Sequence, residues 1–335
     1  MKALYKTDDT FIKLCEVEEP YISEVDDVKI KVKYATLSSE DRNFNQESYY
    51  FSREGIVGHE MCGEIVELGD EAKRQGFKVG DKVGGIPIVH CGKCHLCKSN
   101  RFNCCLEIKL TTGTICEYVV WKSKQLVKLE DNTSYKSGCL IENMSSTIEV
   151  IEKVDISLGD SVAILGSGTC GLLAVALARV RGAKSITVIE PLEYRREMAK
   201  VYGADFIIDS TDKFINNKVM NITDFIGFDI IIDTSSSSEA VNGSLKYLSK
   251  GGKLILYCPF NTYEKINLDL QYIYINNIEI STVFFSNNKI NKANMILENN
   301  NFESLINIEY PFEKAVEAFE MNKNIKYIKI GIKMP

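Results

Sequence analysis

The sequence has no surplus of basic residues and no long apolar run. Its 335 residues include 40 Lys and Arg against 46 Asp and Glu, which gives a net charge of −6. A chain without excess positive charge has little with which to replace phosphate counterions, so a nucleic-acid partner is not expected. No stretch reaches the ~18 apolar residues of a membrane span, and residues 1–7 contain no apolar core of signal-peptide length. We therefore expect a cytoplasmic protein with no membrane partner.

Histidine is equally scarce. His59, His90 and His95 are the only three in the chain. If one of them serves a reaction centre, no spare imidazole is left for a proton relay. A released proton would then leave through a carboxylate, a hydroxyl or water.

Cysteine, by contrast, is abundant and unevenly distributed. Six of the eleven are scattered, mostly in apolar runs, where a thiol usually acts as a small core hydrophobe. The other five lie between residues 91 and 105, a density that in a reducing compartment favours metal binding over disulfides. Four of these have the spacing C-x2-C-x2-C-x7-C, which is typical of a closed structural zinc site: Cys91, Cys94, Cys97 and Cys105.

Several alternatives remain open for this four-cysteine lobe. Cys104 could replace Cys105 as the fourth ligand, and an iron–sulfur cluster could replace zinc. Buried thiols without any metal are a third reading. A zinc ion with four protein ligands has no open coordination position, so it would stabilise the lobe and perform no chemistry. His90 and His95 border the lobe without a predicted role.

The distribution of apolar residues predicts two domains. The first part of the chain is β-rich, with strand patterns at residues 28–34, 63–69 and 117–121. After about Leu158, apolar runs of strand length alternate with helical patterns, which indicates a parallel sheet with crossover helices. The predicted strands of this sheet cover residues 161–165, 186–189, 206–208, 228–232 and 253–257. The alternating residues 327–332 are expected to form a strand that rejoins the first domain.

A glycine motif follows the first strand of the predicted parallel sheet. Its sequence is Gly166-Ser167-Gly168-Thr169-Cys170-Gly171, which matches G-x-G-x-x-G between a strand and a helix. Glycines there allow a tight turn and close approach of a pyrophosphate, which the N-terminus of the helix then binds. Glu190, about 20 residues further on, ends the next strand and can accept hydrogen bonds from ribose hydroxyls. This predicts NAD. NADP stays possible because Arg195 and Arg196 follow closely.

Taken together, these motifs resemble the medium-chain zinc-dependent alcohol dehydrogenase family over nearly the whole chain. The matching segments are Gly58-His59-Glu60, residues 63–69, Gly80-Asp81-Lys82-Val83, the four-cysteine lobe, residues 113–119, Leu140-Ile141-Glu142 and the glycine motif. The resemblance implies an α/β protein with a GroES-like β-rich catalytic domain and a Rossmann domain. It places the catalytic domain at residues 1–147 and 287–335, with the zinc lobe at about 88–108, and the Rossmann domain at 148–286. A homodimer or homotetramer is also implied, and Glu142 resembles the sorbitol, galactitol-phosphate and threonine dehydrogenase branch.

The resemblance also implies a catalytic zinc, but the expected ligand pattern is broken. The family's Cys-Gly-Ser/Thr-Asp motif aligns with residues 38–41, so that Ser38 occupies the position of the metal-binding cysteine. A neutral hydroxyl is a much poorer zinc ligand than a thiolate. Asp41 resembles the carboxylate that orients the ligating imidazole in the family. We hypothesise a compensated site with the ligands His59, Glu60 and Glu142 and a further contribution from Glu40. The alternative is a polar cluster without metal.

The predicted reaction is hydride transfer between NAD and a secondary alcohol of a polyol, sugar or sugar phosphate. Such a site takes a small-molecule substrate, with the ion acting as a Lewis acid on the hydroxyl. The proton would leave through Glu40, Ser39 or water. Two alternatives remain: a zinc-free reductase of the same fold that acts on an activated double bond or carbonyl, and a dinucleotide-binding protein without catalytic turnover.

Overall fold

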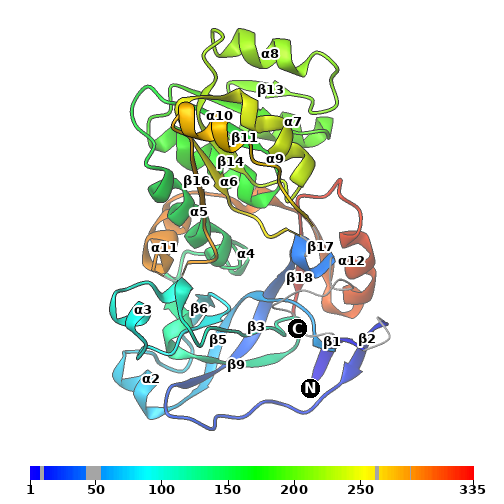
Figure 1. The fold of residues 1–335 in the computed structure, drawn as a ribbon. Coiled ribbons are helices and arrows are strands. Elements are labelled where there is room, and N and C mark those ends of the chain that lie inside the picture. The colour runs from blue at the N-terminus through cyan, green and yellow to red at the C-terminus, as the bar shows by residue number, and fades with distance from the viewer. Residues whose placement is uncertain (8–10, 43–53, 261–263, 287) are drawn as a thin grey trace. The chain divides into compact units, whose positions relative to one another are not determined.

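The chain divides into two compact units. The structure, a computed structural model, describes residues 1–7, 11–42, 54–260, 264–286 and 288–335. Unit 1 comprises Met1–Ser145 and Phe285–Pro335, and unit 2 comprises Ser146–Phe284 (Figure 1). The boundaries expected from the sequence lie two residues further along the chain, and residue 287 is outside the described ranges. Helix α5 (Ile141–Val154) continues through the first boundary, so no break in the sequence pattern marks it.

Unit 1 is built on a seven-stranded sheet. Its strand order is β10-β6-β5-β3-β18-β17, and β9 also pairs with β3. The strands are β3 (Asp27–Leu37), β5 (Glu60–Leu68), β6 (Lys82–Gly85), β9 (Tyr118–Lys122), β10 (Leu126–Lys128), β17 (Ile306–Pro311) and β18 (Lys329–Lys333). The alternating apolar residues of β3, among them Val28, Ile30 and Val32, are fully buried. The C-terminal strand β18 pairs antiparallel with β3 and so enters this sheet.

Two smaller sheets and short helices complete unit 1. The strands β1 (Lys2–Lys6), β2 (Ile12–Glu16) and β4 (Gly55–Ile56) form one sheet, and β7 (Ile88–Val89) and β8 (Lys109–Leu110) form the other. The helices are α1 (Ser39–Arg42), α2 (Asp70–Arg74), α3 (His95–Lys98), α4 (Tyr135–Gly138), α11 (Ile290–Asn299) and α12 (Ala315–Asn322). Helix α12 packs onto the core through Ala315, Ala318 and Phe319.

Unit 2 is a six-stranded parallel sheet with the order β13-β12-β11-β14-β15-β16. Its strands are β11 (Ser161–Leu165), β12 (Ser185–Ile189), β13 (Phe206–Ile208), β14 (Phe228–Asp233), β15 (Leu248–Leu256) and β16 (Glu279–Thr282). The helices between them are α6 (Thr169–Val180), α7 (Glu193–Val201), α8 (Ile215–Ile222), α9 (Ser238–Ser244) and α10 (Leu270–Ile275). This order, with β11 in the interior, is that of a Rossmann domain and confirms the predicted fold class. Within the described ranges, no helix combines the length and apolarity that crossing a bilayer requires.

Candidate active site

Three buried polar side chains meet in unit 1. His59 and Glu60 lie at the start of β5, and Glu142 lies in the first turn of α5. The three are at most 5% exposed, and one potential ligand atom of each lies within 4.8 Å of the others. Burying carboxylates is costly unless a cation or hydrogen-bond donors compensate them. The structure therefore brings together the three residues expected as catalytic metal ligands.

Ser38 is engaged as a helix cap. It follows β3 directly, and its Oγ accepts hydrogen bonds from the backbone N–H groups of Glu40 (3.1 Å) and Asp41 (3.3 Å). In return, Asp41 Oδ2 accepts from the Ser38 backbone N–H (2.7 Å) and from its hydroxyl (3.0 Å). This reciprocal arrangement satisfies the free donors at the start of α1. The Ser38 hydroxyl, at the position of the family's cysteine, therefore accepts hydrogen bonds from the backbone of α1 and donates one to Asp41.

Two carboxylates flank the imidazole of His59. Glu40 Oε2 lies 3.1 Å from Nε2, and Asp41 Oδ1 lies 3.9 Å from Nδ1. Burial by itself lowers the pKa of His59, but the hydrogen bond and charge of Glu40, with the charges of Asp41 and Glu60, outweigh it and raise that pKa to about 10. The carboxylates around His59 therefore stabilise a positive charge at Nε2, whether it is carried by a proton or by a metal ion.

Glu60 is held by a network that the sequence did not reveal. Lys329 Nζ donates to Oε1 (2.8 Å) and forms an ion pair with Oε2 (2.7 Å), and the Thr36 hydroxyl donates to Oε2. The Asn143 side-chain amide donates both to Glu60 Oε1 (2.9 Å) and to Glu142 Oε2 (2.7 Å). Burial by itself raises the pKa of Glu60, yet Lys329 and His59 lower it below its ordinary value. Lys329 belongs to the alternating segment 327–332 and is buried in the structure. A lysine in an otherwise apolar strand is the sequence feature that could have pointed to this network.

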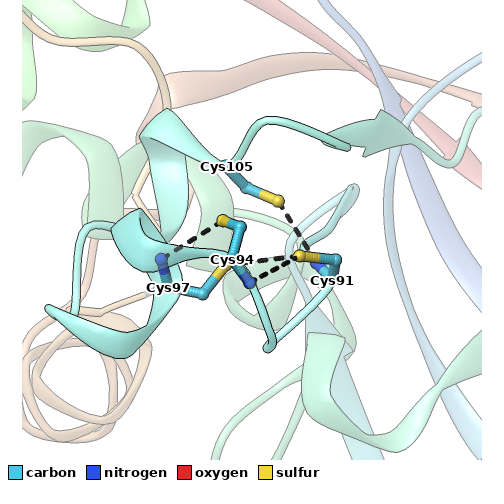
Figure 2. Close-up of side chains that lie close together, drawn as sticks. All are labelled: Cys91, Cys94, Cys97 and Cys105. Carbon is cyan, nitrogen blue, oxygen red and sulfur yellow. Dashed lines mark hydrogen bonds between the residues drawn. The ribbon is translucent and has the colours of Figure 1, made fainter.

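The four-cysteine lobe forms a second cluster (Figure 2). The sulfur atoms of Cys91, Cys94, Cys97 and Cys105 lie within 4.8 Å of one another, and those of Cys91 and Cys97 are 3.9 Å apart. Cys104 is exposed and does not belong to the cluster. Backbone N–H groups point to the sulfurs: Cys94 N donates to Cys91 Sγ and Cys91 N donates to Cys105 Sγ, both at 3.3 Å. The arrangement suits a closed tetrahedral zinc site.

Backbone hydrogen bonds also favour the thiolate form of Cys94 in this lobe. The N–H groups of Leu106 and Cys97 lower the pKa of Cys94 to about 6. A thiol with such a pKa is largely a thiolate near neutral pH, and the thiolate is the form that binds metal.

Cys105→Ser is expected to abolish zinc binding by this lobe and to lower the thermal midpoint, because zinc bound by four protein ligands contributes directly to folding. The matched control Cys104→Ser changes a neighbouring, exposed thiol and should leave both properties unchanged. Zinc content and thermal denaturation of the two variants test this assignment. Loss of zinc from Cys104→Ser with retention in Cys105→Ser would reverse it.

The glycine motif forms the turn between β11 and α6. Gly166 has φ +85°, a conformation that side chains other than glycine rarely adopt. A Cβ on Gly171 would lie 2.3 Å from Gly166 O, so the close packing of helix and turn excludes any side chain there. Gly168 caps α6, and a Cβ there would meet nothing nearer than Arg195 Nη1 at 3.9 Å. This leaves open space at the helix N-terminus, where a pyrophosphate would bind.

Glu190 lies at the carboxyl end of β12 and is 3% exposed. Its carboxylate accepts hydrogen bonds from the backbone N–H groups of Ser167 (2.8 Å) and Leu192 (3.0 Å). Arg196 is occupied elsewhere, with an ion pair to Asp209 at 3.2 Å. Glu190 is therefore fixed beside the glycine turn, and of the two arginines only Arg195 extends toward Gly168.

A Rossmann sheet with this turn, combined with a β-rich unit that carries a cysteine lobe, defines a dinucleotide-dependent dehydrogenase of the two-domain type. Residues 24–131 match the alcohol dehydrogenase GroES-like domain, and residues 169–299 match the zinc-binding dehydrogenase domain.

Similar proteins cover nearly the whole chain. A sorbitol dehydrogenase from Halalkalibacterium halodurans is 30% identical, with 98% of each chain covered. An L-threonine 3-dehydrogenase from Pyrococcus furiosus is 29% identical over 82% of this chain and 80% of its own. The crystal structure of galactitol-1-phosphate dehydrogenase from Escherichia coli has the same fold, with a TM-score of 0.90, 21% identity and coverage of 99% and 100%. The chain belongs to the medium-chain zinc-dependent alcohol dehydrogenase family and is an enzyme of that family.

Proposed function

We propose that the protein oxidises a secondary alcohol of a polyol, sugar or sugar phosphate reversibly, with NAD as hydride acceptor and a metal ion at His59 and Glu142. The observation that carries the proposal is the buried group of His59, Glu60 and Glu142, whose ligand atoms lie within 4.8 Å of one another. The similarity to sorbitol and galactitol-1-phosphate dehydrogenases supports the substrate class. A small hydroxylated molecule also suits a cluster rich in carboxylates.

The donor set of this cluster suits a divalent ion. It offers one imidazole and several carboxylate oxygens, which zinc accepts, and no thiolate among the three clustered residues. When bound, such an ion supplies Lewis acidity, which lowers the pKa of an alcohol hydroxyl. Asp41 lies beside Nδ1 of His59, and Asn143 holds Glu142. The hydrogen bond from Asn143 orients Glu142, whereas Asp41, beyond hydrogen-bond distance, acts on the imidazole through its charge.

The choice of NAD rests on Glu190. Its carboxylate is held by two backbone N–H groups next to the glycine turn, so a 2′-phosphate on the ribose would meet a fixed negative charge. When bound, the nicotinamide ring accepts or returns the hydride. The residues of the turn bind the pyrophosphate, and the open space beside Gly168 admits it.

Glu190→Ser is expected to reduce the preference for NAD over NADP by about 10–100-fold, the equivalent of one charge-assisted hydrogen bond. The ratio of kcat/KM for the two cofactors measures the effect. Glu193→Ser, an exposed carboxylate at the start of α7, is the matched control and should leave the ratio unchanged. An unchanged ratio in Glu190→Ser would refute its role in cofactor selection.

Glu142→Ala separates the proposed enzyme from a zinc-free reductase of the same fold. In a metal-dependent enzyme, kcat should fall by about 100-fold or more, because a ligand of the ion is lost. A zinc-free enzyme would barely respond. Glu130→Ala is the control, because it removes an exposed carboxylate from the same unit and should leave kcat unchanged.

Metal analysis and a substrate screen test the proposal as a whole. We expect about two metal ions per chain, one in the cysteine lobe and one at His59. A screen that follows nicotinamide absorbance across sugar alcohols, sugars and their phosphates should find turnover. A content of about one zinc per chain would show that no metal ion binds at His59, and this part of the proposal would be wrong. Dinucleotide binding without turnover of any substrate would instead favour a protein that binds NAD without catalysis.

The family resemblance further supports a homodimer or homotetramer in the cytoplasm, and we include both in the proposal. Size-exclusion chromatography with light scattering tests the first, and a monomer would contradict it. Fractionation of the source cells tests the second.

A further inference from the structure

The catalytic cluster contains more carboxylates than one ion can use, and their partners differ. Glu40, Asp41, Glu60 and Glu142 all lie near His59. Asp41 is committed to the cap of α1, where it accepts two hydrogen bonds from Ser38. The question is therefore which of the remaining three can bind a metal ion together with His59.

Glu60 is saturated by its present partners. A carboxylate has about four acceptor sites, two on each oxygen. Lys329 and Asn143 donate to Oε1, at 2.8 and 2.9 Å, while Thr36 donates to Oε2 and Lys329 forms an ion pair with it. Both members of the Glu60–Lys329 pair are buried, with side chains 0% and 3% exposed. Breaking a buried ion pair leaves an uncompensated buried charge, so a metal ion would have to displace a well-compensated partner to reach Glu60.

The carboxylate of Glu40 is held less tightly, because its side-chain partner is the imidazole of His59. The Glu40 side chain is 22% exposed, and its Oε2 lies 3.1 Å from His59 Nε2. Two donor atoms bound tetrahedrally to one zinc at about 2.0–2.1 Å lie about 3.3 Å apart. The separation of Glu40 Oε2 and His59 Nε2 is therefore already close to that of two ligands on one ion. Glu40 also follows Ser38 by two residues, which puts an anion next to the position that lacks the thiolate.

We propose that Lys329 selects the ligands of the catalytic ion: it holds Glu60 away from the metal, and Glu40 with His59 and Glu142 forms a site without a thiolate. This inference deepens the proposed function and rests on it. Lys329 is a positioning residue, because it acts through Glu60. Glu40 takes over the negative charge that a cysteine would have provided.

Titration with Co²⁺ tests the ligand set without measuring turnover. The exchangeable ion is removed from the full-length protein with a weak chelator, the zinc of the cysteine lobe is retained, and Co²⁺ is then added. Binding at the free site should give d–d absorption without sulfur-to-cobalt charge transfer. A charge-transfer band would show that a thiolate binds the ion, and the proposal would be wrong.

Glu40→Gln and Glu60→Gln are the decisive pair. Glu40→Gln should weaken Co²⁺ binding by more than about 100-fold, because a ligand of the ion is lost. In Glu60→Gln the loss of Co²⁺ affinity should be at least about tenfold smaller, because Glu60 does not bind the ion directly. Glu130→Gln serves as the exposed control. The reverse order of the two losses, or equal losses, would overturn the proposal and leave a metal-dependent enzyme intact. Absence of any Co²⁺ binding to the unmutated protein, whose cysteine lobe keeps its zinc, would instead refute the metal in the proposed function as well.

A rescue experiment tests the role of Lys329. In Glu40→Gln/Lys329→Met, Glu60 loses its counter-ion and becomes able to bind the metal, so Co²⁺ affinity should recover at least about tenfold over Glu40→Gln. Adding Glu60→Gln to this pair should abolish the recovery. Folding of each variant is checked by the zinc content of the cysteine lobe. Should Lys329→Met fail to fold, the comparison of Glu40→Gln with Glu60→Gln still decides the ligand set. A folded double variant without recovery would refute the selecting role of Lys329.

Discussion

Replacement of His59 by asparagine is expected to lower kcat by at least about 10³-fold. His59 is the only imidazole of the buried cluster, and its Nε2 is the nitrogen that faces Glu40. Without this ligand the catalytic ion is lost, and with it the several kcal/mol by which a Lewis acid stabilises a developing alkoxide. Each tenfold change in rate corresponds to about 1.36 kcal/mol, so a loss of about 4 kcal/mol gives the expected factor. Steady-state kinetics with a polyol found in the screen measures it.

The metal content of the same variant shows why activity is lost. The zinc of the cysteine lobe should remain, because none of its ligands is changed, and the second ion should be absent. His95→Asn is the matched control: this histidine is exposed on α3 and should be replaceable with no change in kcat. Full activity in His59→Asn, or a second ion still bound, would contradict a catalytic centre at His59.

The Rossmann unit was the part of the fold most accessible from sequence. Its buried strands are continuous apolar runs, and the predicted strands 161–165 and 206–208 coincide with β11 and β13. Parallel strands are covered on both faces, so their composition alone identifies them. The N-terminal strands β1 and β2 were not anticipated, because each is short and only Ile12 of β2 is buried.

The proposed catalytic cluster was predictable only where its residues belong to local motifs. His59, Glu60 and Glu142 were identified because the family resemblance marks them, and the structure places them together. Lys329 contacts Glu60 across 269 residues, and no local pattern indicates such a pairing. The cap formed by Ser38 and Asp41, in contrast, has the spacing of a capping box and could have been recognised from the sequence.

Gly171→Ala is expected to destabilise unit 2 by about 1–3 kcal/mol, the usual cost of overpacking. The added Cβ would lie 2.3 Å from Gly166 O and 2.8 Å from Thr234 Oγ1, and the first of these is a backbone atom in a turn at φ +85°. Gly166 O cannot shift without changing the conformation of the glycine turn, so the backbone that binds the pyrophosphate should be distorted as well. We expect a lower thermal midpoint and weaker binding of NADH, measured by fluorescence titration.

Gly243→Ala supplies the opposite case in the same unit. Gly243 lies in helix α9, and a Cβ there would meet nothing within 4 Å. Alanine at an unobstructed helical position is favoured over glycine by about 1 kcal/mol, so this variant should be slightly more stable and bind NADH normally. The two substitutions are chemically identical and differ only in the space available to one methyl group. If Gly171→Ala behaved like Gly243→Ala, the close packing of α6 against the glycine turn would not be needed for cofactor binding.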